Sequence, residues 1–224
     1  MSYEDLQIPR QASTLRTLVE DGLRSAIMSG RFEAGQRLVE RELCEIFGVG
    51  RTSIREGLRQ LEAEGLVTIV PHKGPSVSTI EYEEAEQLYA TRALLESYAG
   101  EQFAERGSAA EMAALTEAVE AFEAAAESGR HDMLLLTKNK FYDVLEKGCG
   151  NVFVRQMLNL LHNRVNLLRS TSMQQPGRIP RAVAEIREIH DAIRSRDSKR
   201  AAAACRHHVE MAAEVALRRL RQKI

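Results

Sequence analysis

The sequence has few of the features that mark secreted, membrane-spanning or metal-bridged proteins. Its 224 residues include three cysteines, Cys44, Cys149 and Cys205. They are odd in number and far apart, so they match neither a disulfide framework nor a metal-ligand spacing. No apolar run approaches the roughly 18 residues of a membrane span, and residues 1–11 lack an apolar targeting segment. We therefore expect a cytoplasmic protein with no membrane partner.

Net charge is also small, at −1 for the whole chain and −1 for residues 1–80. This excludes a nucleic-acid binder with a generally basic surface, so any basic surface must be local. Residues 81–132 carry a net charge of −10 and residues 133–224 one of +10. We interpret this asymmetry as early and late helices that pack side by side and pair their charges. Two oppositely charged solvated faces are the alternative.

Residues 41–69 hold two short helical patterns joined by a tight turn. The first pattern ends at Gly48, where a left-handed residue commonly ends a helix. The second begins at Gly50 or Arg51 and stops at Gly65. The apolar residues at helical spacing are Leu43, Ile46 and Phe47 in the first, and Ile54, Leu58 and Leu61 in the second. Two helices joined by about four residues that include glycine indicate a helix-turn-helix.

The outer face of the second helix carries a stripe of arginines. Arg51, Arg55 and Arg59 lie four residues apart, opposite the apolar face. Thr52 and Ser53 occupy the first turn, where hydroxyl and backbone N–H groups reach phosphates. Such a helix fits the major groove, where arginine contacts guanine bidentately. The alternative is a solvated basic stripe on an ordinary helix. The segments on either side of the helix argue against this alternative.

A hairpin follows the second helix directly. Residues 66–70 have the period-two apolar pattern of a strand, residues 71–75 are predicted to form a turn, and residues 76–80 to form the returning strand. A hairpin in this place is the wing of a winged helix, and His72 and Lys73 at its tip would contact a phosphate or the minor groove. With a helix from Thr14 to Ser29, we expect a flexible lead over 1–12 and a winged helix-turn-helix over 13–79.

These residues resemble the GntR family of bacterial transcription regulators from about residue 15 to 77. The resemblance rests on Glu40–Leu43, Gly48–Glu56, Leu61–Glu62, Gly65–Val67 and the glycine of the wing. It implies contacts to double-stranded DNA by Arg41, Arg51, Thr52, Arg55 and the wing tip, His72, Lys73 and Gly74. The sequence departs from the family at Gly50, where serine or threonine is usual, and at Gly57, where alanine is usual. The second departure costs the helix roughly 0.5–1 kcal/mol.

From Glu81 onward there is no convincing strand. The helices expected there run over Thr79–Arg106, Ser108–Ser128, Asp132–Lys147, Asn151–Ser172, Pro180–Ser195 and Asp197 to the C-terminus. Six amphipathic helices with short connections predict an antiparallel bundle over 80–224. The predicted fold is therefore mainly α, with an N-terminal winged helix-turn-helix and a C-terminal six-helix bundle.

The bundle resembles the effector domain of the FadR branch of the GntR family, the FCD domain. The matching stretches are Tyr89–Glu96, Phe141–Asn151 and Ala192–Val209. Many members of this branch bind a divalent metal through one Asp and three His, which then helps to hold a small carboxylate. Those positions align with Lys138, Tyr142, Ile186 and His208, and only His208 is of a ligand type. We expect no metal; a rebuilt site from His162, His190 and His208 is a weak alternative.

We predict instead a metal-free pocket for a small organic acid gripped by buried cations. The residues assigned to it are Arg92, Lys138, Tyr142, Asn166 and His208. The resemblance directs Arg92 at the effector. The alternative for Arg92 is an ion pair with Glu96, one helical turn away on the same face.

The resemblance implies a homodimeric, ligand-responsive regulator that binds a pseudo-palindromic operator, more commonly as a repressor than as an activator. Two other classes compete with it. A helical metal-dependent enzyme needs a dense ligand set such as a Glu-x-x-His pair, and the bundle lacks one, so we expect no enzyme. An adaptor that used the winged helix only for packing would not need the arginine stripe.

Overall fold

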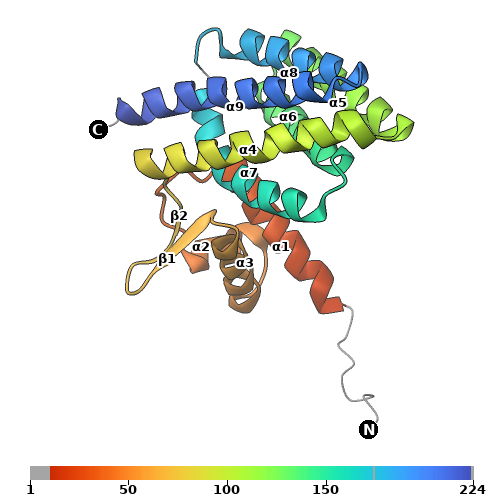
Figure 1. The fold of residues 1–224 in the computed structure, drawn as a ribbon. Helices are drawn as coiled ribbons and strands as arrows, with labels where there is room; N and C mark the ends of the chain where they lie inside the picture. The colour runs from red at the N-terminus through yellow and green to blue at the C-terminus, as the bar shows by residue number, and fades with distance from the viewer. Residues whose placement is uncertain (1–10, 174, 223–224) are drawn as a thin grey trace. The chain divides into compact units, whose positions relative to one another are not determined.

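Helices make up most of the chain that the computed structural model describes, residues 11–173 and 175–222. The chain divides between Thr79 and Ile80 into two units. The elements of the first unit are α1 (Gln11–Met28), α2 (Glu40–Phe47), α3 (Arg51–Ala63), β1 (Val67–Val70) and β2 (Gly74–Val77) (Figure 1). This is the predicted mainly α fold with a two-stranded wing, and the prediction is confirmed.

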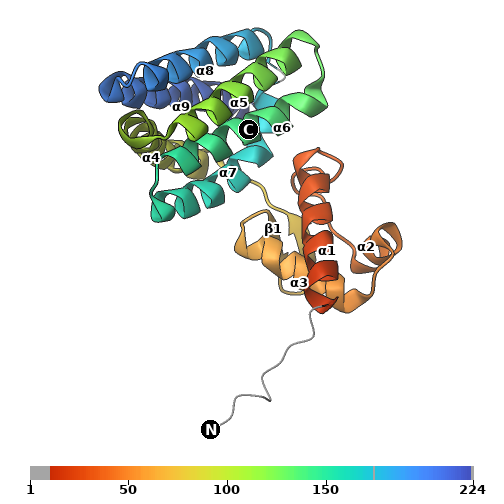
Figure 2. The same ribbon diagram turned by 90° about the vertical axis from the view of Figure 1, so that its right-hand side faces the viewer.

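The core of the first unit forms where α1 packs against α3 (Figure 2). Leu23 from α1 and Ile54 from α3 are both fully buried there. A Cβ atom on Gly57 would lie 3.1 Å from Leu23 Cδ1 and 3.1 Å from Val19 Cγ1. The glycine that weakens α3 as a helix therefore allows the close approach of α1.

The start of α1 and the face of α2 differ from the sequence prediction. Residues 1–10 of the predicted flexible lead lie outside the described residues, but residues 11 and 12 already belong to α1. The apolar face of α2 rests on Leu43, which is buried, while Ile46 is 63% exposed. An eight-residue helix has only a narrow inward face, so helical spacing alone assigned one residue too many to the core.

The hairpin is tighter than predicted. Val67 pairs with Val77 and Val70 with Gly74, so the second strand runs over residues 74–77 and not 76–80. The turn between them adopts left-handed conformations at His72, with φ 65°, and at Gly74, with φ 82°. The free side of β2 is covered by residues 35–38, where the Leu38 amide donates to the Pro75 carbonyl at 2.9 Å. This third segment fixes the base of the wing.

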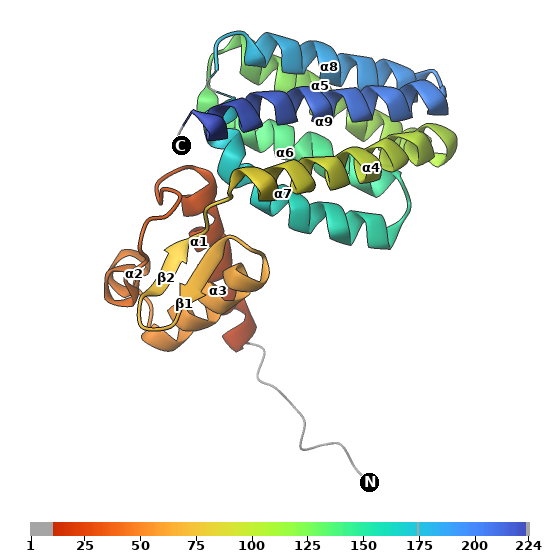
Figure 3. The ribbon, with the colours of Figure 1, turned by 60° about the vertical axis from the view of Figure 1, so that its left-hand side comes forward.

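The second unit is an antiparallel helical bundle. Its helices are α4 (Tyr82–Arg106), α5 (Ala109–Glu127), α6 (His131–Gly148), α7 (Val152–Ser172), α8 (Arg178–Arg194) and α9 (Ser198–Arg221). In Figures 1 and 3, α8, α9, α4 and α7 follow one another in one layer, and α5 and α6 lie behind them. Within the described residues, no helix is long and apolar enough to cross a membrane.

Most helix starts in this unit agree with the sequence, and two do not. One is α8, which begins at Arg178 and not at the predicted Pro180; the other is α4. Ser108 and Glu111 form the predicted capping box at α5, and the Asp197 carboxylate accepts from the Arg200 amide at α9. The prediction that Thr79 caps α4 is wrong, because the helix begins after Glu81 and no side chain caps it.

The opposite charges of the two halves of this unit do pair across helices. Arg164 on α7 forms an ion pair with Glu84 on α4, and Arg187 on α8 forms one with Glu123 on α5. These contacts confirm that early and late helices pack side by side. Because the pairs are partly exposed, each contributes little to stability.

Candidate functional site

The arginine stripe of α3 faces solvent. Arg51, Arg55 and Arg59 are exposed, whereas Ile54 and Leu61 on the opposite side are fully buried. The apolar face holds the helix against the rest of the unit, so its outer side is presented as a rigid surface. Arg41, near the start of α2, is exposed as well.

Arg55 differs from the other arginines because it has an acidic partner. Its Nε lies 2.9 Å from both carboxylate oxygens of Glu40, the first residue of α2. The contact holds the guanidinium in one direction across the two helices. Its Nη groups form no hydrogen bond with another described residue, so they remain available to an incoming acceptor. Sequence reasoning missed Glu40 as the partner of Arg55, because the two residues are fifteen positions apart and lie on different helices.

The N-terminus of α3 is open. Its N-cap residue is Gly50, which supplies no side-chain cap, and the first turn contains no acidic residue. The first backbone N–H groups and the positive end of the helix dipole are therefore available to an anion. Thr52 is exposed and Ser53 is partly buried beside them. This is a suitable arrangement for a phosphate oxygen.

The wing tip is the second exposed basic element of the unit. His72 and Lys73 are both exposed at the turn between β1 and β2, and Gly74 follows them at the start of β2. The structure thus places every residue predicted to contact DNA on the outside of the first unit, with Ser53 and Gly74 less exposed than the others. Their contacts with DNA stay predictions.

A chain of polar side chains runs through the interior of the second unit. Arg92 Nη2 on α4 lies 3.4 Å from the hydroxyl of Tyr142 on α6. That hydroxyl lies 2.8 Å from Nε2 of His208 on α9, and His208 Nδ1 lies 2.6 Å from Oε2 of Glu185 on α8. Arg178 closes the chain with two hydrogen bonds to Glu185, of 3.0 and 2.9 Å. Four helices are thereby joined.

A second branch begins at Arg92. Its Nε donates to Glu96 Oε1 at 2.7 Å, and both residues are 1% exposed. The same oxygen lies 2.8 Å from Nε2 of His162 on α7. The alternative interpretation of Arg92, an ion pair with Glu96, is therefore confirmed, and it does not remove Arg92 from the cluster.

Glu146 on α6 is the end of this branch. His162 Nδ1 lies 2.8 Å from Glu146 Oε1, yet neither carboxylate oxygen of this buried residue has a hydrogen-bond partner among the described residues. The two groups therefore lie close together without hydrogen-bonding geometry. A buried carboxylate in this state costs free energy.

The cluster shifts the pKa values of its members. Burial alone would raise the pKa of Glu96, but the charge of Arg92 and the hydrogen bond from His162 lower it to about 2. Burial lowers the pKa of His208 to about 4, because the loss of hydration, aided by the nearby charges of Lys138 and Arg178, outweighs the support from Glu185. His208 is thus neutral at pH 7.

A neutral His208 carries one N–H proton, and its hydrogen-bond partners decide whether that proton lies on Nδ1 or on Nε2. Glu185 can only accept, so Nδ1 donates to it. Nε2 then accepts from the Tyr142 hydroxyl, whose oxygen in turn receives the Arg92 N–H. Every hydrogen bond in the chain is satisfied by this one arrangement of protons.

The five residues predicted to bind an effector are all buried. Arg92, Tyr142 and His208 are in direct contact, and Lys138 is close enough to lower the pKa of His208. Asn166 is buried on α7. Sequence reasoning missed Glu146, Glu185 and Arg178. The seven-residue spacing of Arg178 and Glu185 places them on one helix face, a signal that could have found this pair.

The residues at the family's metal positions do not fit a divalent ion. Ile186 offers no donor atom, and the Lys138 ammonium lies near His208, where a cation would be repelled. Among residues 11–173 and 175–222, no three His, Cys, Asp or Glu side chains gather in a metal-binding geometry. The alternative set of three histidines receives no support, because His190 contacts Thr116 Oγ1 at 3.0 Å while the other two contact different carboxylates.

Comparison with known proteins identifies both units. A family model described as bacterial regulatory proteins, gntR family, matches residues 15–77, and the FCD domain model matches residues 87–211. The chain belongs to the GntR family of bacterial regulatory proteins. It has the FCD type of C-terminal domain, and the resemblance noted in the sequence is confirmed. This GntR protein is accordingly a DNA-binding transcription regulator and not an enzyme.

Relatives of this GntR protein match it over most of its length. The uncharacterized regulator YdhC of Bacillus subtilis is 26% identical over 180 residues, which are 80% of either chain. The transcriptional repressor GlaR of Escherichia coli is 27% identical over 198 residues, which are 84% of this chain and 89% of that one. A putative GntR regulator from Rhodococcus sp. RHA1 superposes with a TM-score of 0.81 at 21% identity, covering 91% and 98% of the two chains. That structure supports the fold alone.

Proposed function

We propose that this GntR protein is a homodimeric repressor that leaves a pseudo-palindromic operator when a small organic acid binds its FCD domain. The observation that carries the DNA-binding part is the exposed arginine stripe on a helix with an open N-terminus. Arg51 and Arg55 read base edges in the major groove. Phosphate contacts come from Arg41, Thr52 and Ser53, and from His72, Lys73 and Gly74 at the wing tip.

The dimer is supported by an exposed apolar patch on α4 and α7. The two helices pack together, and the Asn151 side chain before α7 donates to the Tyr98 hydroxyl at 3.4 Å. The exposed apolar residues of this patch are Leu94, Tyr98, Val152, Phe153, Met157 and Leu160. Exposed apolar residues gathered on two neighbouring helices are typical of an interaction surface.

A second copy of the chain is the occupant that suits this patch. α7 contains three arginines and no acidic residue, whereas the exposed positions of α4 include Glu83, Glu86 and Glu105. A two-fold axis that sets α4 of one copy against α7 of the other would bring helices of opposite charge together around an apolar centre. The same axis would present two winged helices to two half-sites.

The buried cluster is the proposed site for the organic acid. Its described ionic members balance, with the cations Arg92, Lys138 and Arg178 and the carboxylates Glu96, Glu146 and Glu185. A ligand carboxylate therefore enters by replacing one of these carboxylates, in contact with Arg92, Lys138, Tyr142, Asn166 and His208. When the ligand carboxylate takes the place of a protein carboxylate, the hydrogen bonds between helices change. The ligand then binds two arrangements of the bundle with different affinity, as a regulatory ligand must.

The experiment for DNA binding starts from an operator selected out of a random duplex library with the wild-type protein. Arg51→Ala and Arg55→Ala should each weaken binding to it by roughly 1–3 kcal/mol in fluorescence anisotropy. Arg206→Ala, which removes an exposed arginine from α9, is the matched control and should bind as the wild type does. Wild-type affinity in both α3 variants would favour the adaptor class.

The experiment for the effector is a thermal-melt screen against small carboxylic acids, each with and without a chelator. A ligand at 100 times its dissociation constant adds roughly 2.7 kcal/mol, which is a shift of roughly 5–10 °C for a chain of this size. A shift that survives the chelator supports the metal-free site. A shift that disappears with the chelator would contradict it.

A further inference from the structure

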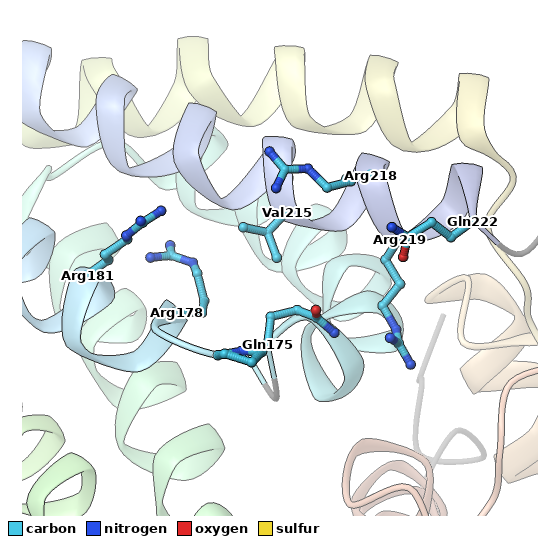
Figure 4. Close-up of a pocket in the computed structure, with 8 residues that line it drawn as sticks. Gln175, Arg178, Arg181, Val215, Arg218, Arg219 and Gln222 are labelled. Carbon is cyan, nitrogen blue, oxygen red and sulfur yellow. The ribbon is translucent and has the colours of Figure 1, made fainter.

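A basic pocket lies outside the buried cluster, between the start of α8 and the end of α9. It has a volume of about 140 Å³. Figure 4 shows Arg178 and Arg181 extending from α8 toward α9. The pocket is lined by Gln175, Pro176, Arg178, Arg181, Val215, Arg218, Arg219 and Gln222. Four of its eight lining residues are arginines and none is acidic, so the pocket has a strongly positive potential.

Two of these arginines have no acidic partner within the part of the chain that the structure describes. Arg178 pairs with Glu185 and Arg218 pairs with Glu214. Arg181 and Arg219 form no ion pair with any residue that the structure describes. The Nε of Arg219 is moreover buried without a hydrogen-bond partner. A desolvated guanidinium N–H that lacks an acceptor is unfavourable, and a bound oxyanion would supply that acceptor.

Because of the helix dipole, the arginines of α8 are stronger evidence for a bound anion than those of α9. Arg218 and Arg219 lie in the last turn of α9, where cations stabilise the helix dipole, so these two have a simple structural explanation. Arg178 and Arg181 lie in the first turn of α8, which has no acidic residue and no side-chain cap at Gly177. Cations at this end of a helix are unfavourable. Glu185 compensates Arg178, whereas a bound anion would compensate Arg181.

We propose that this pocket binds a small, multiply charged oxyanion, either a phosphate group or a polycarboxylate. The pocket has room for a small anion beside its arginine side chains. Arginine is the side chain best adapted to both groups, because its planar fork donates two parallel hydrogen bonds. The site is separate from the buried organic-acid site, and its binding does not depend on the proposed repressor function.

The pocket is connected to the buried cluster through one side chain. Arg178 lines the pocket and also donates both of its hydrogen bonds to Glu185, the partner of His208. An anion in the pocket competes with Glu185 for this guanidinium. Occupation of the pocket therefore weakens the support that Arg178 gives to Glu185, the acceptor of His208 Nδ1, and Arg178 is the one described residue shared by the two sites.

The test is isothermal titration calorimetry of the full chain without DNA, at constant ionic strength maintained with sodium chloride. Inorganic phosphate and citrate are the two probes, and they distinguish the two sources of the anion. Saturable binding of either probe is expected. The double variant Arg181→Gln/Arg219→Gln should bind that probe at least about tenfold more weakly, because it loses both unpaired guanidiniums.

The matched control is Arg206→Gln, which removes one positive charge from α9 outside the pocket and should leave the affinity unchanged. Circular dichroism verifies that the double variant is folded, and Arg178 is left intact because it supports Glu185. Binding of neither probe would overturn the proposal. Equal affinities in the wild type and the double variant would overturn it as well. Both results are independent of operator binding, so the proposed repressor function is tested separately.

Discussion

His208 and Glu185 are joined by a contact of 2.6 Å between Nδ1 and Oε2, which links the last helix of the bundle to the one before it. The contact needs a proton on Nδ1, and the neutral imidazole also leaves Nε2 free to accept from the Tyr142 hydroxyl. Burial, with Lys138 and Arg178 nearby, lowers the pKa of His208 to about 4 and so maintains that state at neutral pH.

Stability should therefore fall as the pH is lowered from about 6.5 toward 4. Over this window the unfolded chain binds a proton at His208 and the folded chain does not, so protons favour unfolding. The contribution lost is on the order of 3 kcal/mol at the lower end. Urea unfolding at a series of pH values measures it, and His208→Asn should show a shallower slope. The exposed neighbour variant His207→Asn should keep the wild-type slope, and equal slopes in all three proteins would contradict the assignment.

Replacement of Arg92 should destabilise the fold as well as alter any ligand response. Arg92→Met leaves the Glu96 carboxylate buried without its main counter-charge, at a cost of roughly 3–5 kcal/mol. Arg92→Met/Glu96→Gln removes both charges and should recover much of that loss in chemical denaturation. A double variant as unstable as the sum of its two single variants would show that the two side chains act independently.

Gly100→Ala should lower stability although alanine favours helices. The added Cβ would lie 2.5 Å from Cys205 Sγ and 3.1 Å from the backbone oxygen of Ala201, where α4 and α9 meet. Overpacking costs typically 1–3 kcal/mol, against a helix-propensity gain of about 1 kcal/mol. Adding Cys205→Ala removes the closest contact and should restore part of the melting temperature. Full stability in Gly100→Ala alone would refute the close packing.

Gly50→Ser should strengthen operator binding. Nothing lies within 4 Å of a Cβ at this N-cap position, and its backbone is extended, with φ −75° and ψ 160°. The hydroxyl gains access to a first-turn N–H and to a phosphate, with a few tenths of a kcal/mol of added helix stability. Gly48→Ser, at φ 64°, is the contrasting control, because a left-handed serine costs roughly 1–2 kcal/mol. Anisotropy and thermal melts measure both.

The dimer should dissociate when a charge is placed in the α4–α7 patch. Phe153 is 73% exposed on α7, and Phe153→Glu buries an unpaired carboxylate in the proposed interface. Sedimentation velocity should then show a monomer. Leu136, 62% exposed on α6 outside the patch, gives the matched variant Leu136→Glu, which should remain a dimer. A dimer in both variants would place the interface elsewhere.

The sequence predicted the fold well because each element has a local signal. Helical spacing, the capping residues Ser108 and Asp197, and the glycines at 48 and 65 define the helices without tertiary information. The errors arose where tertiary contacts decide. The length of β2 depends on its pairing with residues 35–38, and Ile46 is exposed because no helix covers it.

The candidate site was less predictable from sequence. The arginine stripe follows from helix periodicity, but the partner of Arg55 is fifteen residues away and on another helix. In the bundle, Arg92, Tyr142 and His208 could be assigned by resemblance, whereas Glu185 has the sequence appearance of a surface residue. Only the packing of α8 on α9 brings it to His208.

The balance of charges in the bundle interior has a consequence for how this domain can evolve. Loss of any one ionic member leaves its partner buried and uncompensated, so single substitutions there are strongly disfavoured. Substitutions that remove or exchange both partners avoid that cost. Among close relatives, Arg178 and Glu185 should therefore vary together, as should Arg92 and Glu96, and lineages that bind different ligands should differ by whole pairs.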